Sequence, residues 1–136
     1  MTIVQLADNK VAGLRILVVE DDYFVASEIC AALTRSRAEV VGPAPDVRRA
    51  LDLVRHEHID CAVLDINLHG EMVFELASEL QQRRIPAIFA SGYDRSVIPP
   101  GLAGLVHLEK PIDLAALLRA IGATCANTHN ETVTDS

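Results

Sequence analysis

The sequence predicts one α/β domain, in which a parallel five-stranded sheet is doubly wound with helices on both faces. Five short apolar runs of strand length alternate along the 136 residues with segments whose apolar residues recur at helical spacing. The runs are apolar throughout, as expected for strands that are covered on both sides. The length suits one domain. We expect an N-terminal extension over residues 1–12, a folded domain over 13–127 and a disordered polar tail over 128–136.

Composition excludes several classes of protein. The net charge of −7 argues against a broad surface for nucleic acid or anionic membranes. No run of about 18 apolar residues is present and no secretion signal is evident, so we expect a cytoplasmic protein with no membrane contact. The three cysteines form no CxxC motif. We interpret Cys30 and Cys61 as small buried hydrophobic residues in a reducing compartment.

The first two strands are apolar runs with clear stops. Residues 14–19 form a β-branched run that stops at three consecutive acids, and Asp22 is placed to cap the helix that follows. Residues 38–42 form a shorter run that ends at Gly42-Pro43, and Pro45-Asp46 opens a second helix.

The other strands are predicted at residues 60–66, 86–91 and 105–108. Between the last two lies Pro99-Pro100-Gly101, which cannot occupy a helix interior. We therefore expect a shortened fourth helix of one or two turns near residues 94–98. The apolar residues expected on the inner faces of the other helices are Val25, Ile29, Ala32, Leu33, Val47, Ala50, Leu51, Val54, Val73, Leu76, Ala77, Leu80, Leu114, Leu117, Leu118 and Ile121.

Polar and charged residues follow four of the five predicted strands. In a parallel sheet the carboxyl ends of the strands meet at one edge, where ligands bind. Clustered carboxylates repel one another and need a cation, and oxygen ligands without His or Cys favour Mg²⁺. A lysine and a serine in the same crevice suit a phosphoryl group, which Asp65 would carry as nucleophile. The residues at the strand ends are Glu20-Asp21-Asp22, Asp65 with Asn67, Ser91-Gly92 and Glu109-Lys110-Pro111.

The set formed by Glu20-Asp21, Asp65, Ser91 and Lys110-Pro111 resembles the receiver domain of bacterial two-component response regulators over roughly residues 13–126. The resemblance implies a flavodoxin-like sheet of order 2-1-3-4-5. It implies phosphorylation of Asp65 by a histidine kinase or phosphotransfer protein, and a cis peptide bond before Pro111. The implied Mg²⁺ ligands are Glu20, Asp21, Asp65 and the Asn67 main-chain carbonyl. Ser91 and Lys110 would contact phosphoryl oxygens.

The chain departs from the receiver pattern at three places, one of which is the fourth helix, interrupted by Pro99-Pro100. His107 stands three residues before the lysine, where many receivers have an aromatic switch, and we interpret it either as a substitute switch or as a half-buried histidine. Leu68-His69-Gly70 replaces a common Met-Pro pair. Residues 89–93 resemble a single-domain subgroup with Phe-Ala-Thr-Gly-Tyr, which acts as a phosphate relay or sink. Tyr93 is a candidate for tuning hydrolysis, and Gly92 leaves room above the site.

The sequence bears on three other functions. An aspartate-nucleophile phosphatase needs a second acid two residues after the nucleophile, where Asn67 stands. A flavodoxin-like cofactor binder needs a phosphate loop after the first strand, where three acids would repel phosphate. A phosphorylation-independent protein-binding module of the same fold stays open. We expect a signalling domain that phosphorylates and dephosphorylates only itself, not an enzyme, and one that makes no direct contact with nucleic acid. His56 and His58 look like a metal pair, but a solvated helix end is the better interpretation.

Overall fold

The computed structural model describes residues 10–92 and 95–135, and its centre is a parallel sheet of five strands. The strand order is β2-β1-β3-β6-β7, and each neighbouring pair is parallel. Because β6 and β7 are the fourth and fifth strands of this sheet in chain order, the predicted order 2-1-3-4-5 is confirmed. The strands are β1 (Arg15–Val19), β2 (Glu39–Ala44), β3 (Cys61–Leu64), β6 (Ala87–Ser91) and β7 (Val106–Glu109).

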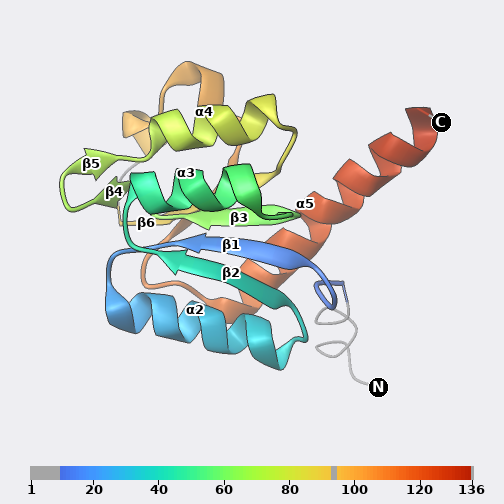
Figure 1. Cartoon of the computed structure of the whole chain (residues 1–136), viewed down its shortest axis with the longest axis horizontal. Coiled ribbons are helices and arrows are strands. Elements are labelled where there is room, and N and C mark those ends of the chain that lie inside the picture. Colours follow the sequence, from blue (N-terminus) through green and yellow to red (C-terminus); the bar gives the residue numbers. More distant parts are fainter. Residues whose placement is uncertain (1–9, 93–94, 136) are drawn as a thin grey trace.

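Helices cover both faces of the sheet (Figure 1). One apolar core lies under α3 and α4, and a second lies under α2 and α5. Each predicted helix has its buried stripe, although Val25, Leu51 and Leu114 are only half-buried. The helices are α2 (Tyr23–Arg35), α3 (Val47–His56), α4 (Phe74–Gln82) and α5 (Leu114–Asp135). Among the residues described, no helix is long and apolar enough to cross a membrane.

Local sequence explains where α2 and α3 begin. The Asp22 side chain accepts hydrogen bonds from the main-chain N–H groups of Phe24 and Val25, as its position after the first strand predicted. Asp46 caps α3 in the same way, through the N–H of Arg49 at 2.8 Å. Such caps satisfy donors that have no partner within the helix, so each start is fixed close to a strand end.

The second strand is longer than predicted. It continues through Pro43 to Ala44, although Gly42-Pro43 was expected to end it. β2 is an edge strand, where a residue without an N–H group is tolerated. Gly42 has φ +100°, and a Cβ there would lie 2.8 Å from the Ala44 nitrogen, so this position requires glycine. The Gly42–Pro43 bond is cis.

A small hairpin after β3 was not predicted. β4 (Asn67–Leu68) pairs antiparallel with β5 (Glu71–Met72). The two residues between them, His69 and Gly70, have φ values of +51° and +85°. Positive φ at both turn residues suits the twist of a two-residue hairpin. The hairpin therefore holds the segment that directly follows Asp65 in a fixed shape.

The segment before β7 carries two short 3₁₀ turns in place of a regular fourth helix. These are η1 (Arg95–Val97) and η2 (Pro100–Leu102). The position and length of η1 agree with the predicted shortening of the fourth helix to one or two turns near residues 94–98. The second begins at Pro100, where a proline is tolerated because the first N–H groups of a helix have no partner.

Both ends of the described chain differ from the sequence expectation. Val11, in the predicted N-terminal extension, is fully buried in the core under α2 and α5. The backbone of α5 is helical through residues 128–135, for which polar composition predicted a disordered tail. No proline or glycine follows Gly122 to interrupt the helical hydrogen bonds. Figure 1 shows this end of α5 extending away from the sheet.

Candidate functional site

A pocket of about 530 Å³ opens where the carboxyl ends of the central strands meet. Strand geometry brings its residues together from distant parts of the chain. The N–H of Asp65 donates to the Val19 carbonyl at 2.9 Å, so Asp65 continues the pairing of β3 with β1. The N–H of Lys110 donates to the Ser91 carbonyl at 3.1 Å in the same way. The pocket is lined by Asp21, Asp65, Asn67, His69, Gly70, Ser91, Gly92 and Lys110.

Three carboxylates converge in this region. One oxygen from each of Glu20, Asp21 and Asp65 lies within 4.8 Å of the others. Glu20 is 4% exposed and Asp65 is 7% exposed, so water screens little of their mutual repulsion. A cluster of hard oxygen donors with this spacing suits a divalent cation such as Mg²⁺.

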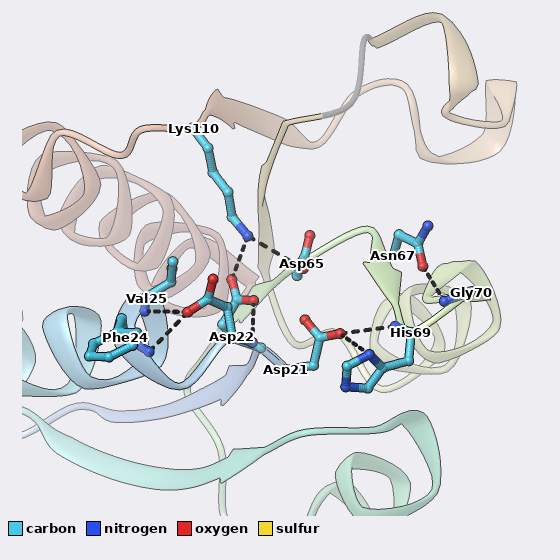
Figure 2. Close-up of polar contacts among 10 residues, drawn as sticks. Asp21, Asp22, Phe24, Val25, Asp65, Asn67, His69, Gly70 and Lys110 are labelled. Atoms are coloured by element: carbon cyan, nitrogen blue, oxygen red, sulfur yellow. Dashed lines mark hydrogen bonds and ion pairs between the residues drawn. The ribbon is translucent and has the colours of Figure 1, made fainter.

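Lys110 supplies the compensating charge (Figure 2). Its Nζ lies 2.8 Å from Glu20 Oε1 and 3.4 Å from Asp65 Oδ2. Burial by itself would lower the pKa of Lys110, but the hydrogen bond to Glu20 and the charges of Asp65 and Glu20 outweigh it, so the pKa is raised. Lys110 therefore remains a cation and connects two of the three acids.

Burial also changes the titration of Glu20. It raises the pKa of this carboxyl from 4.5 to about 7, and the hydrogen bonds from Lys110 and from the main-chain N–H of Asp22 only partly oppose the shift. The charge of Asp65 acts in the same direction as burial. Glu20 is therefore harder to ionise than an exposed glutamate unless a cation joins the cluster.

The third acid, Asp21, is held by the β4–β5 hairpin. The main-chain N–H of His69 donates to Asp21 Oδ2 at 2.9 Å, and the His69 ring nitrogen Nδ1 lies 3.2 Å from the same oxygen. Within the hairpin, the Gly70 N–H donates to Asn67 Oδ1 at 2.6 Å. Figure 2 shows His69 reaching from the hairpin turn to Asp21. The sequence marks Leu68-His69-Gly70 as a departure from the receiver pattern, but it does not predict the contact of His69 with Asp21.

Most of the predicted site residues meet in this pocket. Ser91 is fully buried at the end of β6, and Gly92 lies beside it in the pocket wall. Asn67 is half-buried with its side chain engaged in the hairpin, and the bond before Pro111 is cis as the resemblance implied. Tyr93 lies outside the described residues.

Three other histidines of the described part of the chain, His56, His58 and His107, do not line this pocket. His107 pairs with Phe89 within the sheet and is not among the residues that line the pocket. Its Nε2 is buried without a hydrogen-bond partner among the described residues. The ring of His56 contacts the Asp52 carbonyl at 2.8 Å, whereas His58 pairs with Asp60 at 2.9 Å. The two therefore have separate partners, as the interpretation of a solvated helix end predicted.

Comparison with known proteins places the chain in a family. The model of the response regulator receiver domain matches residues 16–122. The chain belongs to this family. Its members are signalling domains, and receiver function as a phosphoacceptor in two-component systems follows from that membership. Receiver domains generally bind Mg²⁺ at an acidic pocket, in agreement with the carboxylate cluster.

Two curated relatives are transcription or sensory regulators by name. Sensory transduction protein LytT of Bacillus subtilis is 30% identical over 104 residues, which are 74% of this chain and 43% of LytT. Transcriptional regulatory protein TcrA of Mycobacterium tuberculosis is 32% identical over 124 residues, 86% of this chain and 48% of TcrA. The receiver chain thus spans about half the length of these curated relatives.

Solved structures confirm the fold. A CheY-like receiver domain protein from Methanospirillum hungatei has a TM-score of 0.79 at 24% identity, covering 88% of this chain and 99% of that one. SdrG from Sphingomonas melonis has a TM-score of 0.73 at 30% identity, covering 84% and 97%. The first of these shows the arrangement of the fold alone, because its identity is low.

Proposed function

We propose that Asp65 is the phosphoacceptor of this receiver and that it takes a phosphoryl group from a phosphohistidine donor. The observation that carries the proposal is the position of Asp65 in the pocket, 3.4 Å from Lys110 and clustered with Glu20 and Asp21. A nearly buried carboxylate beside Lys110 is suited to carry a phosphoryl group, because Lys110, together with a cation held by the acidic cluster, would oppose the negative charge that arrives.

The acidic cluster fits Mg²⁺. We propose that Glu20, Asp21 and Asp65 each offer a carboxylate oxygen, and that the Asn67 main-chain carbonyl completes the protein ligands. The Asn67 side-chain oxygen already accepts from Gly70, which favours the main-chain oxygen for this role. When bound, Mg²⁺ would offset the negative charge of the phosphoryl group and orient it.

In the proposed reaction an Asp65 carboxylate oxygen attacks the phosphorus in line with the P–N bond of the donor. The P–N bond breaks, and its electron pair stays on the ring nitrogen of the donor histidine. Proton exchange with solvent leaves the donor's ring as neutral imidazole. An acyl phosphate forms on Asp65. In the later hydrolysis, a water oxygen attacks the phosphorus and the bond between phosphorus and the Asp65 oxygen breaks, leaving its electron pair on the Asp65 carboxylate. The water gives up its proton to solvent, and inorganic phosphate leaves.

Two side chains of the pocket are proposed to hold the transferred group. Lys110 would exchange its 3.4 Å contact with Asp65 Oδ2 for a phosphoryl oxygen, because that oxygen carries more charge. The Ser91 hydroxyl, at the end of the neighbouring strand, would donate to a second phosphoryl oxygen. Ser91 ends β6 and Lys110 follows β7, so a movement of both residues would be passed to the ends of these two neighbouring strands.

The donor is proposed to be a histidine kinase or phosphotransfer protein. Tyr23 and Phe24, each 77% exposed, form an edge-to-face pair with ring centroids 5.9 Å apart. They follow Asp22 directly and so stand near the acids of the site. An exposed aromatic pair of this kind suits an apolar protein contact. Small phosphodonors would not use it. We also propose that the protein is cytoplasmic, as the sequence predicted.

The test is phosphorylation at a single site. After incubation with Mg²⁺ and acetyl phosphate, the chain should gain the mass of one phosphoryl group, and Asp65→Asn should abolish the gain. The matched control is Asp52→Asn on an exposed part of α3, which should behave as wild type. No gain with acetyl phosphate or with phosphorylated kinases would instead favour the phosphorylation-independent binding module. An unchanged gain in Asp65→Asn would move the acceptor elsewhere.

A further inference from the structure

The β4–β5 hairpin contacts a metal-ligand candidate that is 48 positions away in sequence. Its turn residue His69 makes two contacts with Asp21 Oδ2. The main-chain N–H lies at 2.9 Å and the ring nitrogen Nδ1 at 3.2 Å. The His69 side chain is 83% exposed, and that of Asp21 is 14% exposed. A surface residue therefore fixes a nearly buried acid of the pocket.

The contact determines which nitrogen of the ring carries a hydrogen. An ionised carboxylate only accepts hydrogen bonds, so the ring must donate from Nδ1. Both donors meet Oδ2, and a carboxylate has a second oxygen with its own lone pairs. Oδ1 thus remains available to a cation, and the two functions of Asp21 do not exclude each other.

The hairpin turn is built to keep this arrangement. His69 and Gly70 both have positive φ, and the Gly70 N–H is bonded to Asn67 Oδ1. Histidine and asparagine are among the non-glycine residues that tolerate the left-handed region. The turn therefore presents the N–H and the ring of His69 to Asp21 without further adjustment.

We propose that His69 is a positioning residue for the metal site, which orients Asp21 so that the cation meets a preformed ligand. The proposal rests on the function proposed above for the acidic cluster. Residues that hydrogen-bond metal ligands commonly account for about ten- to a hundredfold in metal affinity. Without His69, Asp21 would have to become ordered on binding, which weakens affinity. Among the described residues the hydrogen bond and ion pair of His69 are with Asp21, so His69 would act through Asp21.

Two substitutions distinguish the contribution of the His69 ring to metal binding from that of the main chain of the turn. His69→Gly removes the ring, keeps the main-chain N–H and accepts positive φ without strain. His69→Asn also accepts positive φ and retains a short side-chain donor. Mg²⁺ dissociation constants are measured by titration calorimetry at one fixed pH and without any phosphodonor. We expect about a tenfold weaker affinity for His69→Gly and a partial recovery for His69→Asn.

The phosphorylation assay supplies the second measurement. At saturating Mg²⁺, His69→Gly should reach the same extent of acetyl phosphate labelling as wild type, with only its half-saturating Mg²⁺ concentration raised by the same factor. Equal or tighter Mg²⁺ binding by His69→Gly would overturn the proposal, and so would a labelling defect that saturating Mg²⁺ does not correct. Because calorimetry needs no phosphoryl transfer, failure of Asp65 as acceptor would leave the binding result readable.

Discussion

Glu20 should make the metal-free protein less stable as the pH rises toward neutral, and Glu20→Gln should remove this dependence. The carboxyl is 4% exposed, and burial raises its pKa from 4.5 to about 7. Between these values the folded chain keeps a proton that the unfolded chain has lost. The folded state then binds more protons, so the free energy of unfolding falls as the pH rises.

The size of the effect follows from the shift. The difference between 4.5 and about 7 is roughly 2.5 pKa units, and each unit corresponds to about 1.4 kcal/mol. Wild type should therefore lose about 3 kcal/mol relative to Glu20→Gln across this range, and the difference should level off above about pH 8. Lys110 stays charged throughout, because its pKa is raised.

Urea unfolding followed by far-UV circular dichroism measures the difference between pH 4.5 and 8.5 with EDTA present. Subtracting the variant from wild type cancels the other titrating groups. Glu28→Gln, an exposed position on α2, is the matched control and should show no such trend. A wild-type minus Glu20→Gln difference that stays flat over this range would refute the reasoning. Saturating Mg²⁺ should flatten the slope, because the cation favours ionised Glu20.

Two further predictions concern the fold and the donor. Gly42→Ala should lower the free energy of unfolding by about 2 to 3 kcal/mol, because it adds a Cβ to a residue with φ +100° and a main-chain contact of 2.8 Å. Gly101→Ala, where the added Cβ meets nothing within 4 Å, is the control, and equal losses in urea unfolding would contradict the argument. Phe24→Ser should slow transfer from a phosphorylated kinase several-fold while leaving acetyl phosphate labelling unchanged, since the ring is 77% exposed beside the site. Equal rates from the kinase with both proteins, measured by loss of label from the donor, would exclude this surface.

The fold was predictable because its signals are local. Apolar runs and helical spacing are set by neighbouring residues, and an all-parallel sheet forces the strand ends to one edge. That is why Asp65, Ser91 and Lys110 could be assigned to one pocket before any coordinates. The capping role of Asp22 followed from the same local logic.

The sequence was a weaker guide where the bounds of an element or the burial of a residue depend on tertiary packing. The second strand passes through Pro43 because an edge strand does not need that N–H, and edge position is known only from the complete sheet. The hairpin after β3 gave a short signal, His69-Gly70, that is compatible with a turn but specifies no partner. The buried Val11 in the N-terminal segment likewise depends on helices far along the chain.

The sequence by itself determined the strands of a parallel sheet and the identity of the acids at the strand ends, and its resemblance to receiver domains implied the strand order. Only the tertiary structure decided how those acids are held. Burial between strands raises the pKa of Glu20, Lys110 joins Glu20 to Asp65, and a hairpin 48 positions away fixes Asp21 through His69. Charge and periodicity depend on residues that are neighbours in the sequence. Desolvation and contacts between distant segments arise only when the chain is packed.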